Sequence, residues 1–198
     1  MSYSDFTLRG VQEAFRLEII ENSGLFSKLE ELIPSEFFLA TLEENIPLAV
    51  SIHTEKARSE LIISNVLVEI RKQFDRKISF FSGVEFSVDK EKGLSGYCDF
   101  IISLSPEQLF VRTPVVFLVE AKNENTVGGL GQCIAEMIAA SLFNQEQRTI
   151  YGAVTTGTAW RFLKLQKNAV YIDLRDYYLE EKPGKILGIL SSMLKQVA

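Results

Sequence analysis

The sequence has little of the residue types on which several common kinds of site depend. Its 198 residues include one histidine, His53, and two cysteines, Cys98 and Cys133. One histidine excludes a histidine-rich zinc site and argues against a mechanism with a histidine base. Two cysteines make no disulfide framework, and we expect them to be reduced thiols in a cytoplasmic protein.

Long apolar runs and an excess of positive charge are also missing. No run approaches the roughly 20 apolar residues of a membrane helix, and the opening residues, MSYSDFTLRG, contain no apolar signal core. We therefore expect no membrane partner. The net charge of −5 argues against a protein whose whole surface binds nucleic acid. It leaves room for a basic rim around an acidic pocket, because the distribution of charge decides binding more than its sum does.

The length suits one domain, and the large share of Phe and Tyr supplies a core. We expect residues 1–50 to form an N-terminal helical extension packed on a core domain of residues 51–198. Within the extension, residues 25–32 are a candidate short helix between two breakers, Gly24 and Pro34. Ser35 fits the N-cap of a second helix.

The order of elements after residue 50 predicts a mixed α/β domain. Thr54 fits the N-cap of a long amphipathic helix that ends near Phe74. A second helix, with small residues on one side, follows the third of six strand-like runs, and a third helix closes the chain at 186–197. The strand-like runs are 78–88, 96–104, 115–121, 149–155, 160–165 and, as a last edge strand, 170–174. We expect a meander packed between helices and a right-handed parallel crossover from 115–121 to 149–155.

Three charged residues at strand positions are the candidates for chemistry. The run PVVFLVEAKN places Glu120 and Lys122 two positions apart, so that both side chains point to one side of the strand. Asp99 lies inside the otherwise apolar strand GYCDFII, where a charge is costly unless it is paired or bound to a metal. If the two strands are antiparallel neighbours, Asp99 comes close to Glu120. Two adjacent carboxylates repel each other unless a cation intervenes, and their hard oxygens suit Mg²⁺.

These residues resemble the core motif of the PD-(D/E)xK nuclease superfamily, which has the restriction-endonuclease-like fold. The motif here reads Asp99, a spacer of 20 residues, and then Glu120-Ala121-Lys122. Glu60 lies in the long helix, where many members carry an additional acid, and Gln132 resembles the glutamine of the RecB-like exonuclease branch. The resemblance runs from about residue 54 to residue 165, with a cysteine in place of the motif proline. The blocks GLSGYCDF, VEAKNEN and GQCIAEMIAA also resemble a group of small stand-alone bacterial proteins of the superfamily.

The resemblance implies a restriction-endonuclease-like α/β fold with a mixed β-sheet flanked by helices, and a role for each motif residue. Asp99 and Glu120, with the carbonyl of Ala121, would bind Mg²⁺ or Mn²⁺. Lys122 would orient the attacking water, Glu60 would hold a second metal or a water, and Gln132 would position Lys122 or the phosphate. The implied activity is a metal-dependent nuclease that hydrolyses phosphodiester bonds of DNA. Cutting both strands of a duplex would favour a homodimer.

A simple structural reading stands beside each of these roles. Glu120 and Lys122 would also suit a solvated ion pair at a strand end. Asp99 would also suit a buried acid satisfied by backbone groups or by Tyr97. Glu60 and Gln132 would also suit the solvated faces of their helices.

Three further alternatives stay open at this point. Glu136 lies one turn after Gln132 and is either a support for the site or an exposed helix acid. Arg58 contacts either phosphate or only solvent. The whole chain is either a nuclease or a catalytically inactive nucleic-acid-binding or interaction protein on a nuclease-like fold.

Overall fold

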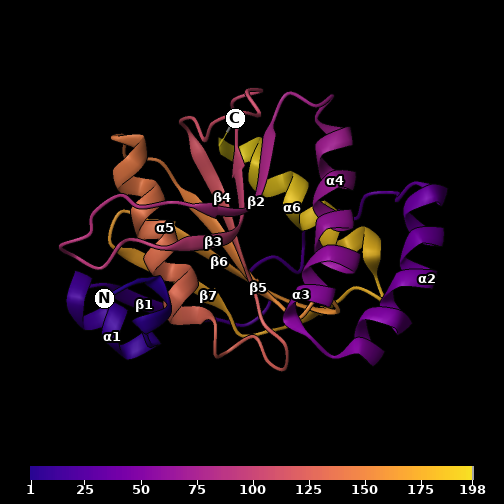
Figure 1. The fold of residues 1–198 in the computed structure, drawn as a ribbon, viewed down its shortest axis with the longest axis horizontal. Helices are drawn as coiled ribbons and strands as arrows, with labels where there is room; N and C mark the ends of the chain where they lie inside the picture. The colour runs from indigo at the N-terminus through magenta and orange to yellow at the C-terminus, as the bar shows by residue number, and fades with distance from the viewer. Residues whose placement is uncertain (198) are drawn as a thin grey trace.

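A computed structural model describes residues 1–197 as one mixed sheet between two layers of helices (Figure 1). Ala198, the last residue of the domain expected over 51–198, lies outside the described residues. The strands are β1 (Glu18–Asn22), β2 (Ser79–Glu85), β3 (Tyr97–Ser103), β4 (Val115–Ala121), β5 (Ile150–Thr155), β6 (Ala159–Gln166), β7 (Ala169–Asp173) and β8 (Tyr177–Tyr178). The helices are η1 (Tyr3–Asp5), α1 (Leu8–Phe15), α2 (Glu36–Ile52), α3 (Glu55–Arg58), η2 (Ser59–Ile63), α4 (Ser64–Gln73), α5 (Leu130–Asn144) and α6 (Pro183–Val197).

The sheet follows the order β1-β7-β6-β5-β4-β3-β2, with β8 paired to β6. The strands β2, β3 and β4 form the expected antiparallel meander, and β4 then pairs with β5 in parallel through α5. The mixed α/β prediction and the parallel crossover are therefore confirmed. Strand β4 is buried along its whole length, as expected for a central strand with helices on both sides.

The two faces of the sheet bury separate apolar clusters. Helices α2, α4 and α6 cover one face, and α1 and α5 cover the other (Figure 1). The glycine Gly131 of α5 allows α1 to approach closely, because a Cβ there would lie 2.3 Å from the carbonyl oxygen of Phe6. Among residues 1–197, no helix combines the length and the apolar character needed to cross a bilayer.

Three sequence-based expectations about the outer strands and the N-terminal region are wrong. Residues 1–50 include a strand, β1, which pairs in parallel with β7 and is therefore part of the sheet. Strand β7 is consequently internal instead of the edge. The segment 25–32 forms turns and extended chain, because it packs through Leu32 against α6, where the Leu32 amide donates to the carbonyl of Gly184 at 2.9 Å.

The long helix predicted from Thr54 is present but is interrupted by one π-helical turn. The Thr54 side chain caps it by accepting a hydrogen bond from the amide of Ala57 at 3.1 Å. The π turn, η2, adds a residue to one turn, so Ile62 and Ile63 are both buried and the apolar stripe continues in α4. Such turns often lie beside functional sites.

We expect Gly188→Ala to destabilise the protein by about 1–3 kcal/mol or more, as overpacking usually does. A Cβ on Gly188 would lie 2.0 Å from the carbonyl oxygen of Glu30, and this neighbour is backbone that cannot rotate away. The matched control is Gly128→Ala, whose Cβ would find its nearest atom at 3.5 Å, on Asn125. Chemical denaturation of both variants checks this expectation, and an unchanged midpoint for Gly188→Ala would contradict the close packing of α6.

Candidate active site

The site lies where β4 ends, at the residues Glu120 and Lys122. The Glu120 carboxylate is 1% exposed, and the Lys122 ammonium donates to its Oε1. The two side chains therefore share one side of the strand, as the alternation predicts. The Lys122 amide donates to the carbonyl of Thr155 at 2.8 Å, so β5 fixes the backbone at this point. The burial of Glu120 excludes a fully solvated ion pair.

Asp99 joins the site from β3, the antiparallel neighbour of β4. The paired residues of the two strands end at Phe100 opposite Val119. Beyond that pair, Asp99 Oδ2 accepts the amide hydrogen of Ala121 at 2.8 Å. The Asp99 carboxylate thus lies between the two strand ends, in the electrostatic neighbourhood of Glu120.

Gln132 enters from the first turn of α5 and contacts both members of the charged pair. Its Nε2 donates to Glu120 Oε2 at 2.9 Å, and its Oε1 lies 3.5 Å from Lys122 Nζ. Gly129, immediately before α5, allows this approach. A Cβ at Gly129 would lie 2.6 Å from Val154 and 3.1 Å from Glu120 and Lys122. Gln132 is therefore part of the site and does not lie on an open helix surface.

The helix that precedes the meander brings two acids toward the site in different ways. Glu60 is 63% exposed and pairs with Lys56 at 3.5 Å. Glu55, which the sequence did not single out, interacts electrostatically with Asp99 and Lys122. Burial, together with the charge of Asp99, raises the pKa of Glu55 against the opposing effect of Lys122. Both acids line a groove of about 310 Å³ that Asp99 also lines.

The buried side chain of Arg58 links α3 to the ends of β4 and β5. Its side chain is almost fully buried; Nε donates to Asn123 Oδ1 at 3.1 Å and Nη1 donates to the carbonyl of Thr156 at 2.9 Å. Neither open alternative for Arg58, a contact with phosphate or with solvent alone, describes this arrangement. These two hydrogen bonds of Arg58 connect the segment that carries Glu55 to the ends of β4 and β5.

Closely spaced carboxyl groups dominate the electrostatics of the site. Burial, with the charges of Asp99 and Glu55, raises the pKa of Glu120 to about 8, although Lys122 opposes the shift. Burial also acts to lower the pKa of Lys122, but the carboxylates of Glu120, Glu55 and Asp99 outweigh it and raise that pKa. The one lysine does not compensate all the acids around it, so the site favours a further cation.

The donor set suits a hard divalent cation of the Mg²⁺ type. Mg²⁺ usually binds through one or two carboxylates and keeps several waters, which matches Asp99 and Glu120. Among residues 1–197, no three His, Cys, Asp or Glu side chains converge on one point. An ion held by Asp99 and Glu120 would therefore take its remaining ligands from water or substrate.

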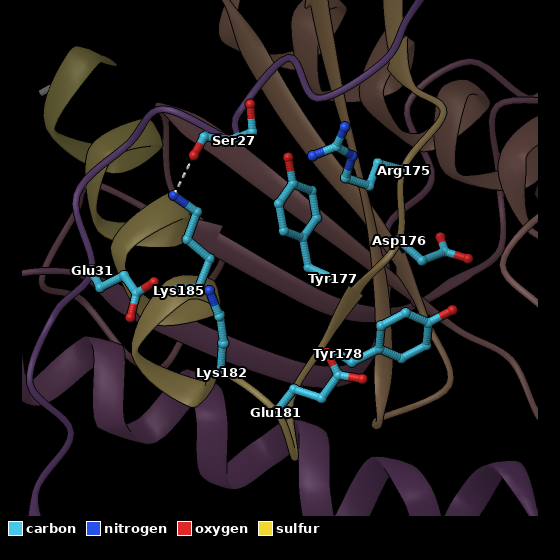
Figure 2. Close-up of a pocket in the computed structure, with 9 residues that line it drawn as sticks. All are labelled: Ser27, Glu31, Arg175, Asp176, Tyr177, Tyr178, Glu181, Lys182 and Lys185. Atoms are coloured by element: carbon cyan, nitrogen blue, oxygen red, sulfur yellow. Dashed lines mark hydrogen bonds between the residues drawn. The ribbon is translucent and has the colours of Figure 1, made fainter.

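A second cavity, of about 340 Å³, lies away from these residues (Figure 2). Three acidic and three basic side chains line it, so it favours neither sign of charge: Glu31, Asp176 and Glu181, with Arg175, Lys182 and Lys185. Lys185 already donates to the backbone carbonyl of Ser27 at 2.7 Å, the contact drawn in Figure 2. This cavity contains none of the residues that the motif predicts.

The sequence matches no known protein-family model, and no curated protein is similar to it. The geometry at the end of β4 is therefore the basis for the functional argument.

Proposed function

We propose that this protein is a metal-dependent nuclease of the PD-(D/E)xK superfamily, and that it hydrolyses phosphodiester bonds of DNA. One observation carries the proposal: Asp99, Glu120, Lys122 and Gln132 come from three separate elements and meet at the end of β4. If these side chains were only a solvated ion pair and isolated polar groups of a helix, they would not be expected to lie together at one strand end.

The order of elements around the motif supports the same proposal. A long helix, an antiparallel meander, a crossover helix and a parallel strand follow one another in the chain, from α3 to β5. The two acids of the motif lie on the last two strands of the meander, and Gln132 lies at the start of the crossover helix. These are the positions that the resemblance implies for the restriction-endonuclease-like fold.

Each side chain has a role that its surroundings permit. Asp99 and Glu120 would hold Mg²⁺ or Mn²⁺, with the carbonyl of Ala121 as a further ligand. When bound, the ion supplies a more acidic water and a counter-charge for the phosphate. Lys122 orients the attacking water and offsets charge that develops on the phosphate. Gln132 fixes the relative positions of the Lys122 and Glu120 side chains, because its amide oxygen contacts one and its amide nitrogen contacts the other.

The second candidate is a catalytically inactive nucleic-acid-binding or interaction protein on the same fold. The acidic lining of the groove beside Asp99 favours the interaction protein over a nucleic-acid binder, because Glu55 and Glu60 repel phosphate while Lys56 alone attracts it. The presence of both carboxylates and of Lys122 favours the nuclease instead, since a site without catalysis has no need of the whole set.

A cleavage assay decides between the two candidates. The purified protein is incubated with labelled single-stranded DNA, duplex DNA and RNA, in Mg²⁺, in Mn²⁺ and in chelator. We expect DNA to be cut with either metal, and no cutting in chelator. Nucleic-acid binding without cleavage under every condition would contradict the nuclease and favour the inactive candidate.

The two helix acids are expected to differ in importance. We expect Glu55→Gln to lower the rate of metal-dependent cleavage about tenfold or more, the usual effect of losing a group that supports a metal site. Glu60→Gln should change the rate less, because Glu60 is paired with Lys56, whereas the charge of Glu55 acts on Glu120 and Lys122. Steady-state rates of both variants at one Mg²⁺ concentration check this. A larger loss in Glu60→Gln would assign Glu60 the metal or water role that the resemblance implies.

The proposal includes a cytoplasmic location and a homodimer for the cutting of duplex DNA. The two cysteines are free and buried, which suits a reducing compartment. Sedimentation analysis of the protein with and without duplex DNA tests the dimer.

A further inference from the structure

Glu136 is a fully buried acid that the proposed chemistry does not use. It lies on α5 one turn after Gln132 and is 0% exposed, so it is not the exposed helix acid of the open alternative. Its Oε1 accepts a hydrogen bond from Gln132 Nε2 at 3.2 Å. Within residues 1–197, its Oε2 has no hydrogen-bond partner, and no Lys, Arg or His forms an ion pair with it.

A carboxyl group in this position is more stable in its protonated form than in its charged form. An unpaired charge without water or a cation is among the most costly groups to bury. Burial and the charge of Glu120 raise the pKa of Glu136 well above its ordinary value. The other ionisable groups around it are Asp99, Lys122 and the thiols of Cys98 and Cys133, with Tyr3 near the thiol of Cys98.

The contacts of Gln132 show what Glu136 contributes. A carboxylate accepts hydrogen bonds, and an ammonium group only donates them. The Gln132 oxygen must therefore face Lys122, which leaves the amide nitrogen to face the two acids. The nitrogen does contact both Glu120 and Glu136, while the oxygen lies 3.5 Å from Lys122 Nζ. With Glu136 removed, one of the two N–H groups loses its partner and the amide is free to rotate.

We propose that Glu136 is a positioning residue that fixes the amide of Gln132 and, through it, the Glu120–Lys122 pair. Its neutral form accepts from Gln132 without adding a second charge beside Glu120. The effect on cleavage rests on the proposed nuclease function, whereas the effect on the orientation of Gln132 does not.

The test compares Glu136→Gln, which keeps the shape and an acceptor, with Glu136→Leu and Glu136→Met, which remove the acceptor. Circular dichroism identifies which apolar variant folds, and that variant is used. The readouts are the NMR shifts of the Gln132 side-chain amide protons in metal-free buffer, Mn²⁺ affinity and cleavage rate. The Gln132 signals are assigned by their loss in Gln132→Leu.

We expect the apolar variant to move the Gln132 amide signals toward their solvent-exposed positions. Mn²⁺ affinity and cleavage should fall about tenfold, the usual effect of losing an outer support, and Glu136→Gln should rescue both. Unchanged Gln132 signals in the apolar variant would overturn the inference and make Glu136 a packing residue only. Because the NMR readout needs neither metal nor cleavage, failure of the nuclease proposal and failure of this inference are distinguishable.

Discussion

Lys122→Ala is expected to reduce metal-dependent cleavage of DNA by about 100-fold to 10,000-fold, the range for loss of a group that assists proton transfer. Lys122 is the only cation within hydrogen-bonding distance of Glu120 among residues 1–197. Its removal takes away both the group that orients the water and a counter-charge for the phosphate. Initial rates on labelled DNA at saturating Mg²⁺ measure the effect.

The protein should remain folded after this substitution, because loss of Lys122 raises the pKa of Glu120 further and the buried carboxyl group keeps its proton. Circular dichroism and the thermal midpoint establish this before the rates are compared. Lys92→Ala is the matched control: it removes an exposed lysine between β2 and β3 that pairs with Asp89, and it should change the rate only slightly. A wild-type rate in Lys122→Ala would remove Lys122 from the mechanism.

In metal-free buffer, the free energy of unfolding should decrease between pH 5 and pH 8, with about 3 kcal/mol of the decrease from Glu120 alone. The acids Glu120, Glu136 and Glu55 all have raised pKa values in the folded protein. In the unfolded chain they lose their protons near pH 4.5, whereas the folded protein must keep Glu120 protonated up to about pH 8. Stability is therefore complete below the unfolded pKa and falls as the pH rises toward the folded pKa.

Among residues 1–197, no shifted group acts in the opposite direction in this window. Glu69, Asp5 and Asp89 have lowered pKa values, so their contributions change only below about pH 4.5. The raised pKa of Lys122 matters only above pH 10. Urea unfolding at each pH measures the slope. Glu120→Gln should make the dependence shallower, and so should Mg²⁺, which favours the ionised carboxylates. A stability of the wild type that is constant or rises from pH 5 to pH 8 would contradict the buried-acid account.

The central strands and the placement of their charged residues were predictable because local signals agree there. The apolar run of β4 predicts residues 115–121, and the structure has the strand at those bounds. Alternation along a strand is a local rule, so it places Glu120 and Lys122 together without knowledge of the fold. Their contact with Gln132 follows from the parallel crossover, which the order of elements also predicts.

The parts that sequence reasoning missed depend on long-range contacts. Strand β1 is short and half-exposed, and it pairs with a strand about 150 residues later, so no local pattern distinguishes it. Glu55 and Glu60 lie on the same helical segment, and only the position of α3 against the strand ends distinguishes them. The one available signal for the close approach of α5 was the glycine pair before it, of which Gly129 is in contact with the site.

Calorimetric titration of Mn²⁺ into chelator-treated protein tests the central claim most directly. The wild type is compared with Glu120→Gln and with Glu44→Gln, a control that changes an exposed acid of α2. We predict binding of Mn²⁺ by the wild type and the control and loss of that binding in Glu120→Gln. Equal binding by all three proteins, or no binding by any of them with or without an uncleavable DNA analogue, would contradict a metal site at Asp99 and Glu120.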